Sequence, residues 1–342
     1  MLTLIDDILR SQPVRRLDGE VIGESREGRP VQGFLMGAGQ CRVSLLGGCH
    51  ADEPVGPLLL RHLAAYLRAL PATDPLLQKY QWWIIPHINP DGEERNRAWY
   101  DDADTAYDLG RYLQHVVREL PGDDIEFGFP RDDTDTGARP ENRAAYEWWS
   151  SADGPFALHA TLHGMGFAAG PWYLLEEAWR DRVEPFKATC REQVGRQGYV
   201  LHDVERHGEK GFVRLDRGFC TRPDSGAMRR YFLDQNDPGM ASRFRPSSME
   251  TIRGLGGDPL TLVSEMPLFI TPGVGETLGP PDPVAVAWKD RVEGWRTMVR
   301  GGGTPDAITE AGDRAGLRAM PVRDQMVLQW GMVVAGLQLV CG

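Results

Sequence analysis

The chain has 342 residues, of which 25% are charged and 41% are hydrophobic, and its formal net charge is −11 at pH 7. This length can bury one large α/β core or two modest ones, and the composition excludes disordered and fibrous proteins. The acidic balance argues against a broad binding surface for nucleic acid or an anionic membrane, and it favours a small or peptide-like substrate.

The first ten residues predict a short amphipathic helix that contains acidic side chains. They lack a basic region followed by an apolar stretch, so we expect a cytoplasmic location rather than export. The number of cysteines is odd and none forms a close pairing motif, which favours free thiols in a reducing compartment over a disulfide framework. These cysteines are Cys41, Cys49, Cys190, Cys220 and Cys341.

Short apolar runs then alternate with longer helical patterns, which is typical of an α/β fold with a mixed, mostly parallel central sheet flanked by helices. The predicted strands span 31–36, 43–46, 82–85, 156–162, 199–203 and 260–264. The predicted helices between them span 54–70, 105–120, 140–150, 176–197, 226–233 and 283–299.

A glycine-rich segment at 301–305 precedes two further predicted helices, 306–318 and 322–339. The second contains the most apolar run of the chain, but polar residues interrupt that run, and a bilayer span needs about 20 apolar residues. We therefore expect a packed terminal helix. The main domain is assigned to 1–304, with a helical C-terminal extension over 305–342 packed on it, and the oligomeric state stays open.

His50 and Glu53 follow the strand predicted at 43–46 through two glycines, so both lie on a loop at the carboxyl end of a strand. Open α/β sheets place their active sites at this end. One turn can direct an imidazole and a carboxylate three residues apart at a single metal ion. Alone, this spacing is a weak signal, because Glu53 is equally suited to the positive end of a helix dipole.

A further histidine ligand is predicted at the end of the strand 156–162. His163 stands beside Gly164 and Gly166, which leave room for an ion and a substrate. His159 lies four residues away and faces the same side of the strand, so periodicity alone leaves both candidates open. The neighbouring glycines favour His163, and His159 is then a core or supporting histidine.

Glu265 lies directly after the predicted strand 260–264 and completes a possible hydrolytic site. Two imidazoles and one carboxylate are a common catalytic ligand set for Zn²⁺ and leave the fourth position open for water. A separate carboxylate is then needed to accept the proton of that water. Glu265 is the candidate for this role.

Several motifs in the same order resemble the zinc-dependent metallocarboxypeptidases of the carboxypeptidase A type. That family combines H-x-x-E, a distant histidine and a distant catalytic glutamate. The segments Gly23-Glu-Ser-Arg-Glu-Gly-Arg29, Asn89-Pro-Asp-Gly92 and Asn96-Arg97-Ala-Trp99 resemble its G-x-S-x-x-G-R, N-P-D-G and N-R-x-W. The resemblance extends over most of the chain and implies a zinc carboxypeptidase-like α/β fold.

The resemblance also implies a role for each candidate. His50, Glu53 and His163 would bind one Zn²⁺ per chain, Arg97 would polarise the scissile carbonyl and stabilise the oxyanion, and a zinc-activated water would attack with Glu265 as general base. The expected substrate is a peptide or an acylated amino acid.

The segment Asp124-Ile-Glu-Phe-Gly-Phe-Pro130 resembles the D-L-N-R-N-F-P of the same family. The resemblance implies that Asp124 accepts the outer N–H of His50. Glu126 and Phe127 replace the Asn-Arg pair that holds a free C-terminal carboxylate, so substrate binding at this point is expected to differ. The nearby cations Arg214, Arg217 and Arg222 could meet a substrate carboxylate instead, or Glu126 could receive a cationic group.

Three alternatives remain. The segment His50-Ala-Asp-Glu-Pro-Val-Gly56 also resembles the H-x-x-E-P-x-G of aspartoacylase and succinylglutamate desuccinylase relatives, which are acyl-amino-acid amidohydrolases. A murein-peptide amidase is compatible with the same site. A zinc-binding interaction protein is the non-enzymatic alternative, although the presence of Glu265 and Arg97 beside the ligands argues against it.

Overall fold

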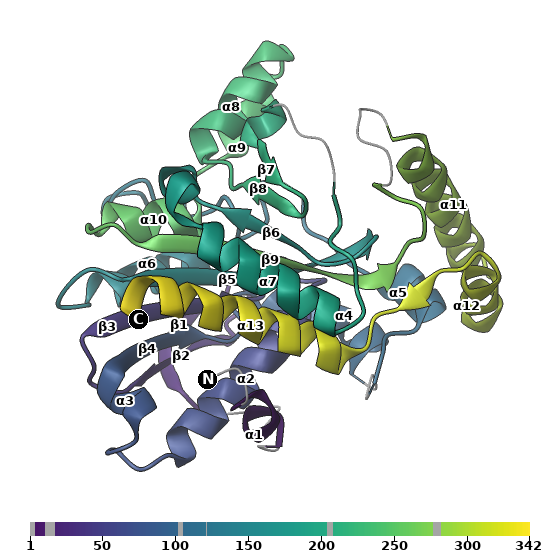
Figure 1. Cartoon of the computed structure of the whole chain (residues 1–342). Coiled ribbons are helices and arrows are strands. Elements are labelled where there is room, and N and C mark those ends of the chain that lie inside the picture. Colours follow the sequence, from purple (N-terminus) through teal and green to yellow (C-terminus); the bar gives the residue numbers. More distant parts are fainter. Residues whose placement is uncertain (1–3, 11–17, 102–104, 121, 204–207, 276–281) are drawn as a thin grey trace.

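The computed structural model describes residues 4–10, 18–101, 105–120, 122–203, 208–275 and 282–342. Within them, ten strands form one sheet in the order β1-β2-β4-β3-β5-β9-β6-β8-β7, and β10 pairs with β9 (Figure 1). The strands are β1 (Glu20–Glu24), β2 (Pro30–Met36), β3 (Cys41–Gly47), β4 (Tyr80–Ile85), β5 (Leu158–Ala168), β6 (Trp172–Leu175), β7 (Arg214–Asp216), β8 (Phe219–Thr221), β9 (Leu260–Ile270) and β10 (Arg318–Ala319).

The sheet is mixed, as expected. Its central strands β4, β3, β5 and β9 run parallel to one another, and β6 runs parallel to β8. Antiparallel pairs lie outside this centre, at β1–β2, β2–β4, β6–β9, β7–β8 and β9–β10. The parallel centre brings the carboxyl ends of β3, β5 and β9 to one edge of the sheet.

Helices cover both faces of the sheet (Figure 1). Helices α2, α7 and α13 lie over one face, whereas α6 and α10 lie over the other, and α11 and α12 stand beside α5. The helices are α1 (Ile5–Arg10), α2 (Val55–Ala69), α3 (Pro75–Lys79), α4 (Pro90–Tyr100), α5 (Leu109–His115), α6 (Pro140–Ser150), α7 (Glu184–Arg196), α8 (Ser225–Asp234), α9 (Pro238–Arg243), α10 (Ser248–Gly254), α11 (Pro283–Arg300), α12 (Pro305–Arg314) and α13 (Val322–Cys341), with short 3₁₀ turns η2 (Glu177–Arg182) and η3 (Glu209–Gly211).

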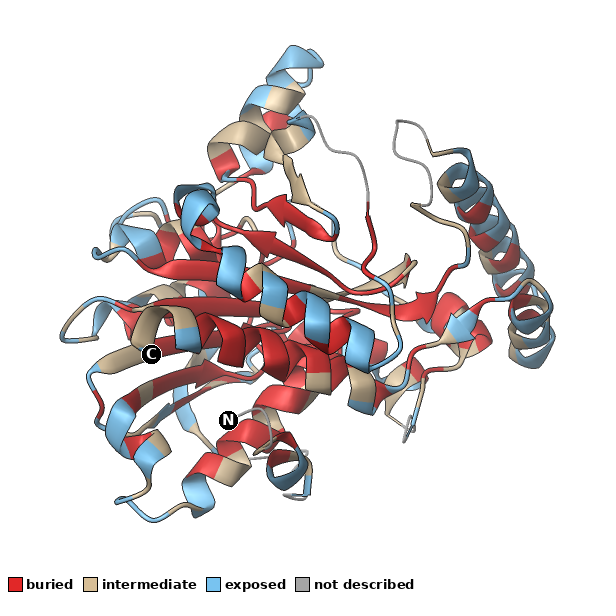
Figure 2. Cartoon of the chain, in the orientation of Figure 1, coloured by how far each residue is buried: buried red, intermediate tan, exposed pale blue. Residues whose placement is uncertain are grey.

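Two apolar layers hold the sheet between these helices. Successive side chains of a strand point to opposite faces, so Leu45 packs in the layer under α2 and α13 while Leu46 packs in the layer that contains Trp149 of α6. Figure 2 shows that the strands of the sheet centre are buried along most of their length. The sheet centre therefore provides a rigid support for side chains at its edge.

Helix α13 is the packed terminal helix expected from the sequence. Buried residues occur on all its sides, including Leu328, Trp330 and Val333, because α7, α2 and the sheet surround much of it. In the described part of the chain, no helix combines the length and apolar character needed to cross a membrane. The division of the chain at residue 304 stays a prediction.

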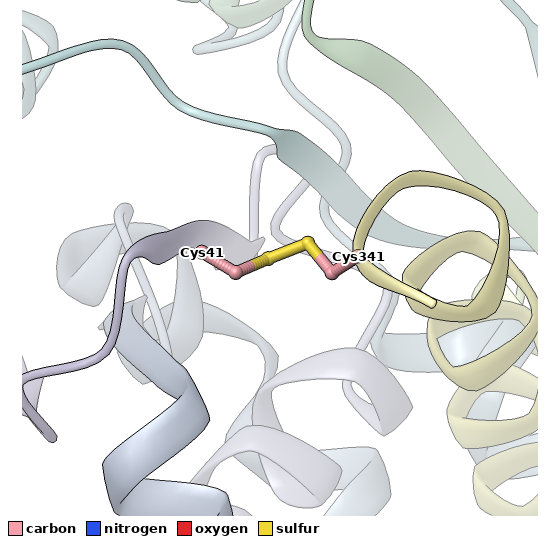
Figure 3. The surroundings of a disulfide bond; sticks show 2 residues. All are labelled: Cys41 and Cys341. Carbon is pink, nitrogen blue, oxygen red and sulfur yellow. A yellow bond between two sulfur atoms is a disulfide. The ribbon is translucent and has the colours of Figure 1, made fainter.

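A disulfide joins Cys41, at the start of β3, to Cys341, in the last turn of α13 (Figure 3). It links positions 300 residues apart in sequence, with a Cα–Cα distance of 6.3 Å. The expectation of free thiols throughout is therefore wrong for this pair, because the fold brings two remote cysteines together without any local motif. The cysteine argument for a reducing compartment no longer holds, and the cytoplasmic location stays a prediction.

Several predicted elements differ from those observed. The segment 199–203 is not a strand, because its backbone bonds to the end of α7 and to Pro171 rather than to a neighbouring strand. The helix predicted at 176–197 is divided at Val183 into η2 and α7, and the one predicted at 105–120 shortens to α5. The segment Asn89-Pro-Asp-Gly92 begins helix α4, with Asn89 accepting a hydrogen bond from the Gly92 N–H as its cap.

Candidate metal centre

The end of β3 and the middle of β5 and β9 bring the predicted site residues together, since β5 and β9 continue beyond the ends expected from the sequence. His50 and Glu53 lie on the loop after β3, His163 lies within β5, and Glu265 of β9 is the register partner of His163. The loop turns at Gly48, whose φ is 73°, and a Cβ there would lie 2.3 Å from the ring of His87. Only glycine satisfies both requirements.

His50, Glu53 and His163 form a close cluster. The Nδ1 atom of His50 lies 2.8 Å from Glu53 Oε1, and Nδ1 of His163 lies 2.9 Å from Glu53 Oε2. The two Nδ1 atoms are 3.3 Å apart. Two nitrogens bound to one zinc ion at about 2.05 Å with a tetrahedral angle would stand about 3.3 Å apart. These residues therefore fit a zinc ion in number, kind and spacing.

The charges of the cluster favour an ionised carboxylate between two imidazoles. Burial opposes the ionisation of Glu53, but His50 and His163 outweigh it and hold the pKa of Glu53 well below its usual range. Burial likewise lowers the pKa of His163, yet Glu53 and Glu126 reverse the effect and raise that pKa well above the usual value. A divalent cation bound here would offset the negative charge of Glu53 and Glu126.

Glu265 has the opposite character. Burial, together with the negative charge of Glu53, raises the pKa of Glu265 to about 8. It lines a cavity of about 270 Å³ that also contains His50 and His163 in its wall. A carboxyl whose pKa lies near neutrality is suited to accept a proton and return it.

His159 lies outside the cluster. It is fully buried, its Nδ1 is 2.9 Å from the hydroxyl of Ser44, and its Nε2 is 3.0 Å from the hydroxyl of Ser248. Its ring also packs edge-on against Trp149. The geometry therefore gathers His163 with His50 and Glu53 and leaves His159 in the core.

Arg97 does not lie at the cluster. It stands on the exposed side of α4, where its Nη1 is 3.1 Å from Glu94 and its Nε is 4.0 Å from Asp101. The buried face of that helix carries Asn96 and Trp99 instead. The expected contact of Arg97 with a scissile carbonyl stays a prediction, and the contacts of this side chain on the exposed side of α4 do not support it.

Arg118 is one of the cations that the fold places at this cavity. Its Nη1 lies 3.1 Å from Asp52 Oδ2 and 3.5 Å from Glu53 Oε1, and the side chain lines the same cavity as Glu265. It follows α5, in the loop that leads to Asp124. Its position six residues before Asp124 is the only sequence signal that could have identified it.

Asp124 and Phe127 both line the cavity. Asp124 is buried, and burial raises its pKa against the opposing charge of His50. Among the described residues, its Oδ1 has no hydrogen-bond partner, so the expected hydrogen bond from His50 stays a prediction. The ring of Phe127 packs against Phe244, with ring centroids 5.4 Å apart.

Glu126 contacts protein groups with both of its carboxylate oxygens. Arg222 donates from Nη2 to Glu126 Oε1 at 2.6 Å, and Glu126 Oε2 lies 3.3 Å from His163 Nε2. Burial opposes ionisation, but Arg222 and His163 hold the pKa of Glu126 well below its usual range. The sequence made Arg222 a candidate cation for a substrate carboxylate. In the structure, Arg222 instead pairs with Glu126.

A second cavity, of about 1220 Å³, adjoins the first at Arg118. It lies between α11 and the sheet, and its wall includes Tyr112, Phe167 and Trp288. Its volume exceeds the roughly 300–1,000 Å³ of a typical small-molecule pocket. The candidate centre therefore lines the smaller cavity, which meets the larger one at Arg118.

Comparison with known proteins places these features in a family. A family model described as zinc carboxypeptidase matches residues 1–213. Duck (Anas platyrhynchos) carboxypeptidase D is 31% identical over 134 residues, covering 37% of this chain and 9% of the relative. Mouse (Mus musculus) carboxypeptidase M is 29% identical over 161 residues, covering 43% of this chain and 34% of the relative. The chain thus spans only a minor part of the curated relatives it matches.

The fold has a solved counterpart from Shewanella amazonensis SB2B, named as a metallopeptidase candidate. That structure covers 99% of this chain and 93% of its own, with a TM-score of 0.53 and 13% sequence identity. This likeness shows a shared fold. The family match ends at residue 213, so the assignment of Glu265 depends on its place beside His163 in the sheet.

Proposed function

Because the chain belongs to the zinc carboxypeptidase family, we propose that it is a zinc-dependent hydrolase that cleaves an amide bond of a peptide or peptide-like substrate. The observation that carries this proposal is the convergence of His50, Glu53 and His163 beside Glu265. A zinc ion held by the first three residues would supply Lewis acidity to a water molecule and to the scissile carbonyl.

The protein's own side chains then divide the proton and charge chemistry. Glu265 accepts a proton from the attacking water at its carboxylate and returns it to the leaving amine. Arg118 directs its guanidinium at the same cavity and offsets the negative charge that develops on the carbonyl oxygen. Asp52 and Glu53 hold Arg118 in place through ion pairs.

The substrate is proposed to be an extended chain with an apolar group on one side of the scissile amide. Four phenylalanines contribute to the wall of the small cavity, beside its charged residues, and the larger cavity beyond Arg118 has room for several residues of a peptide-like chain. Phe127 supplies no cation, and Arg222 is engaged by Glu126. A free C-terminal carboxylate is therefore not required by the groups of this segment.

Product analysis by mass spectrometry tests the proposal. The purified zinc-loaded protein is incubated with free-C-terminal peptides, C-terminally amidated peptides, N-acyl amino acids and γ-linked murein peptides, with Glu265→Gln as the control. Cleavage of amidated or γ-linked peptides that the variant cannot perform supports the proposal. Cleavage confined to N-acyl amino acids identifies an acyl-amino-acid amidohydrolase instead, and no cleavage by fully zinc-loaded protein refutes the enzymatic assignment.

A further inference from the structure

A chain of buried polar side chains leads from the sheet core to the candidate metal centre. Each member contacts the next, and none is more than 9% exposed. The members come from β3, β5, α10, the end of β8 and the loop after α5, so five separate segments of the sequence contribute. In order, they are Ser44, His159, Ser248, Arg222, Glu126 and His163.

The first three members, Ser44, His159 and Ser248, support Arg222 from the sheet core. Its Nη2 donates to the hydroxyl oxygen of Ser248 at 3.1 Å, and that hydroxyl lies 3.0 Å from His159 Nε2. Because Arg222 can only donate, the hydroxyl proton of Ser248 is left to donate to His159 Nε2. His159 Nδ1–H then donates to Ser44 Oγ at 2.9 Å. With this tautomer, both ring nitrogens of His159 have a hydrogen-bond partner, which explains why a fully buried histidine is stable here.

The next two members, Arg222 and Glu126, lead to the candidate metal ligand His163. Arg222 donates to Glu126 Oε1 at 2.6 Å, a short charge-assisted hydrogen bond. Glu126 Oε2 and His163 Nε2 lie 3.3 Å apart as a buried charged pair, and within the described residues neither atom has a partner that meets hydrogen-bond geometry, so each faces the other as an unsatisfied group. Without Arg222, Glu126 would be an uncompensated buried carboxylate near Glu53, an arrangement with a large desolvation cost.

Cys49 also lies beside Glu126 and His163, and these three could in principle hold a metal ion of their own. Burial raises the pKa of the Cys49 thiol to about 11, and only the thiolate is a good ligand. Glu126 is in turn engaged by Arg222. Cys49, Glu126 and His163 are therefore poorly suited to bind a second metal ion, and Glu126 is better suited to contact His163.

We infer that Glu126 is a positioning residue, which Arg222 and Ser248 hold so that its Oε2 accepts the Nε2–H of His163. This contact fixes the tautomer in which Nδ1 of His163 is unprotonated and directed at the metal, and it limits rotation of the ring. The inference rests on the proposed zinc site. It assigns Glu126 to the metal centre rather than to the substrate, and it explains why an acid stands next to the Phe127 wall of the cavity.

The decisive variant is Glu126→Gln. Arg222 would still bind the amide oxygen at the position of Oε1, which leaves the amide N–H₂ facing His163 Nε2. Two donors then oppose each other, so His163 is driven to carry its proton on Nδ1 and loses its metal-binding tautomer. We expect zinc affinity, measured by competition with a chromophoric chelator, to fall about 10- to 100-fold. Zinc binding within twofold of the parent protein would overturn the inference.

A double variant separates positioning from a merely structural role. In Glu126→Gln combined with Arg222→Met, the amide is free to turn its oxygen toward His163, so zinc should bind more tightly than in Glu126→Gln alone. A structural role predicts that the second substitution adds to the first loss. The matched control is Glu176→Gln, which alters another buried glutamate paired with an arginine, Arg253, and should leave zinc affinity within twofold.

A measurement on the parent protein keeps the inference testable if a variant does not fold. In the ¹H–¹⁵N histidine spectrum of the zinc-loaded protein, His163 should show a protonated Nε2 and a metal-bound Nδ1, and the reverse pattern would overturn the inference. Neither readout needs turnover. A protein that binds zinc as described but cleaves none of the amides above would therefore refute the proposed function and leave this inference intact.

Discussion

Glu265 should make the metal-free protein less stable as the pH rises, and Glu265→Gln should remove this effect. In the folded protein the pKa of Glu265 is about 8, whereas an unperturbed glutamate ionises near 4.5. Between these values the folded state keeps a proton that the unfolded state has lost. The free energy of unfolding therefore falls as the pH rises through this window.

The magnitude follows from the width of that window. Each pH unit corresponds to about 1.4 kcal/mol, so the full window from about 4.5 to 8 corresponds to about 5 kcal/mol. Glu53 supplies part of the negative field at Glu265 and can respond to the substitution. We therefore expect the variant to gain about 3 to 5 kcal/mol over the parent protein between pH 4.5 and 8.5.

Urea denaturation in the presence of a metal chelator measures this difference, with the disulfide intact in both proteins. Other titrating groups are shared, so the difference between parent and variant isolates Glu265. Glu147→Gln, which changes an exposed glutamate of α6, is the matched control and should show no such trend. A stability difference between parent and Glu265→Gln that stays constant from pH 4.5 to 8.5 would refute the reasoning.

Three further predictions concern the metal, the oxyanion and the disulfide. His163→Ala should lose stoichiometric zinc while His159→Ala keeps it, as measured by elemental analysis after dialysis; the reverse result would exchange their roles. Arg118→Ala should lower kcat about 10²- to 10³-fold, whereas Arg97→Ala should change it less than threefold, and equal losses would contradict the placement of these arginines. Cys341→Ser should lower the free energy of unfolding by about 4 kcal/mol under oxidising conditions, and no change relative to the oxidised parent would show that the disulfide does not stabilise the fold.

Local sequence patterns were sufficient for the main elements of the fold and for the types of metal ligand. Strands β3 and β4 and helices α2, α6, α11 and α13 follow their predicted ranges closely, because apolar periodicity reflects burial directly, whereas β5 and β9 continue six residues beyond their predicted ends. His50 and Glu53 converge through one loop, and His163 and Glu265 occupy equivalent points on neighbouring parallel strands. Short-range geometry and strand order therefore explain why the spacing of these residues predicted a site.

Long-range packing decided what the sequence left open or predicted wrongly. Arg97 and Arg118 are both arginines near the site in sequence, but only the completed helix α4 shows that Arg97 faces outward. Cys41 and Cys341 pair because α13 ends beside the start of β3.

The sequence by itself determined the predicted ligand chemistry, since residue types and their order suffice to predict two imidazoles, a carboxylate ligand and a general base. Only the tertiary structure decided the partners of those groups. Glu126 looked like a substrate residue until Arg222, 96 positions later in the chain, proved to hold one of its oxygens while His163 faces the other. The physical reason is that a buried charge needs a neutralising partner. For Glu126 this partner is Arg222, which comes from a distant segment of the sequence.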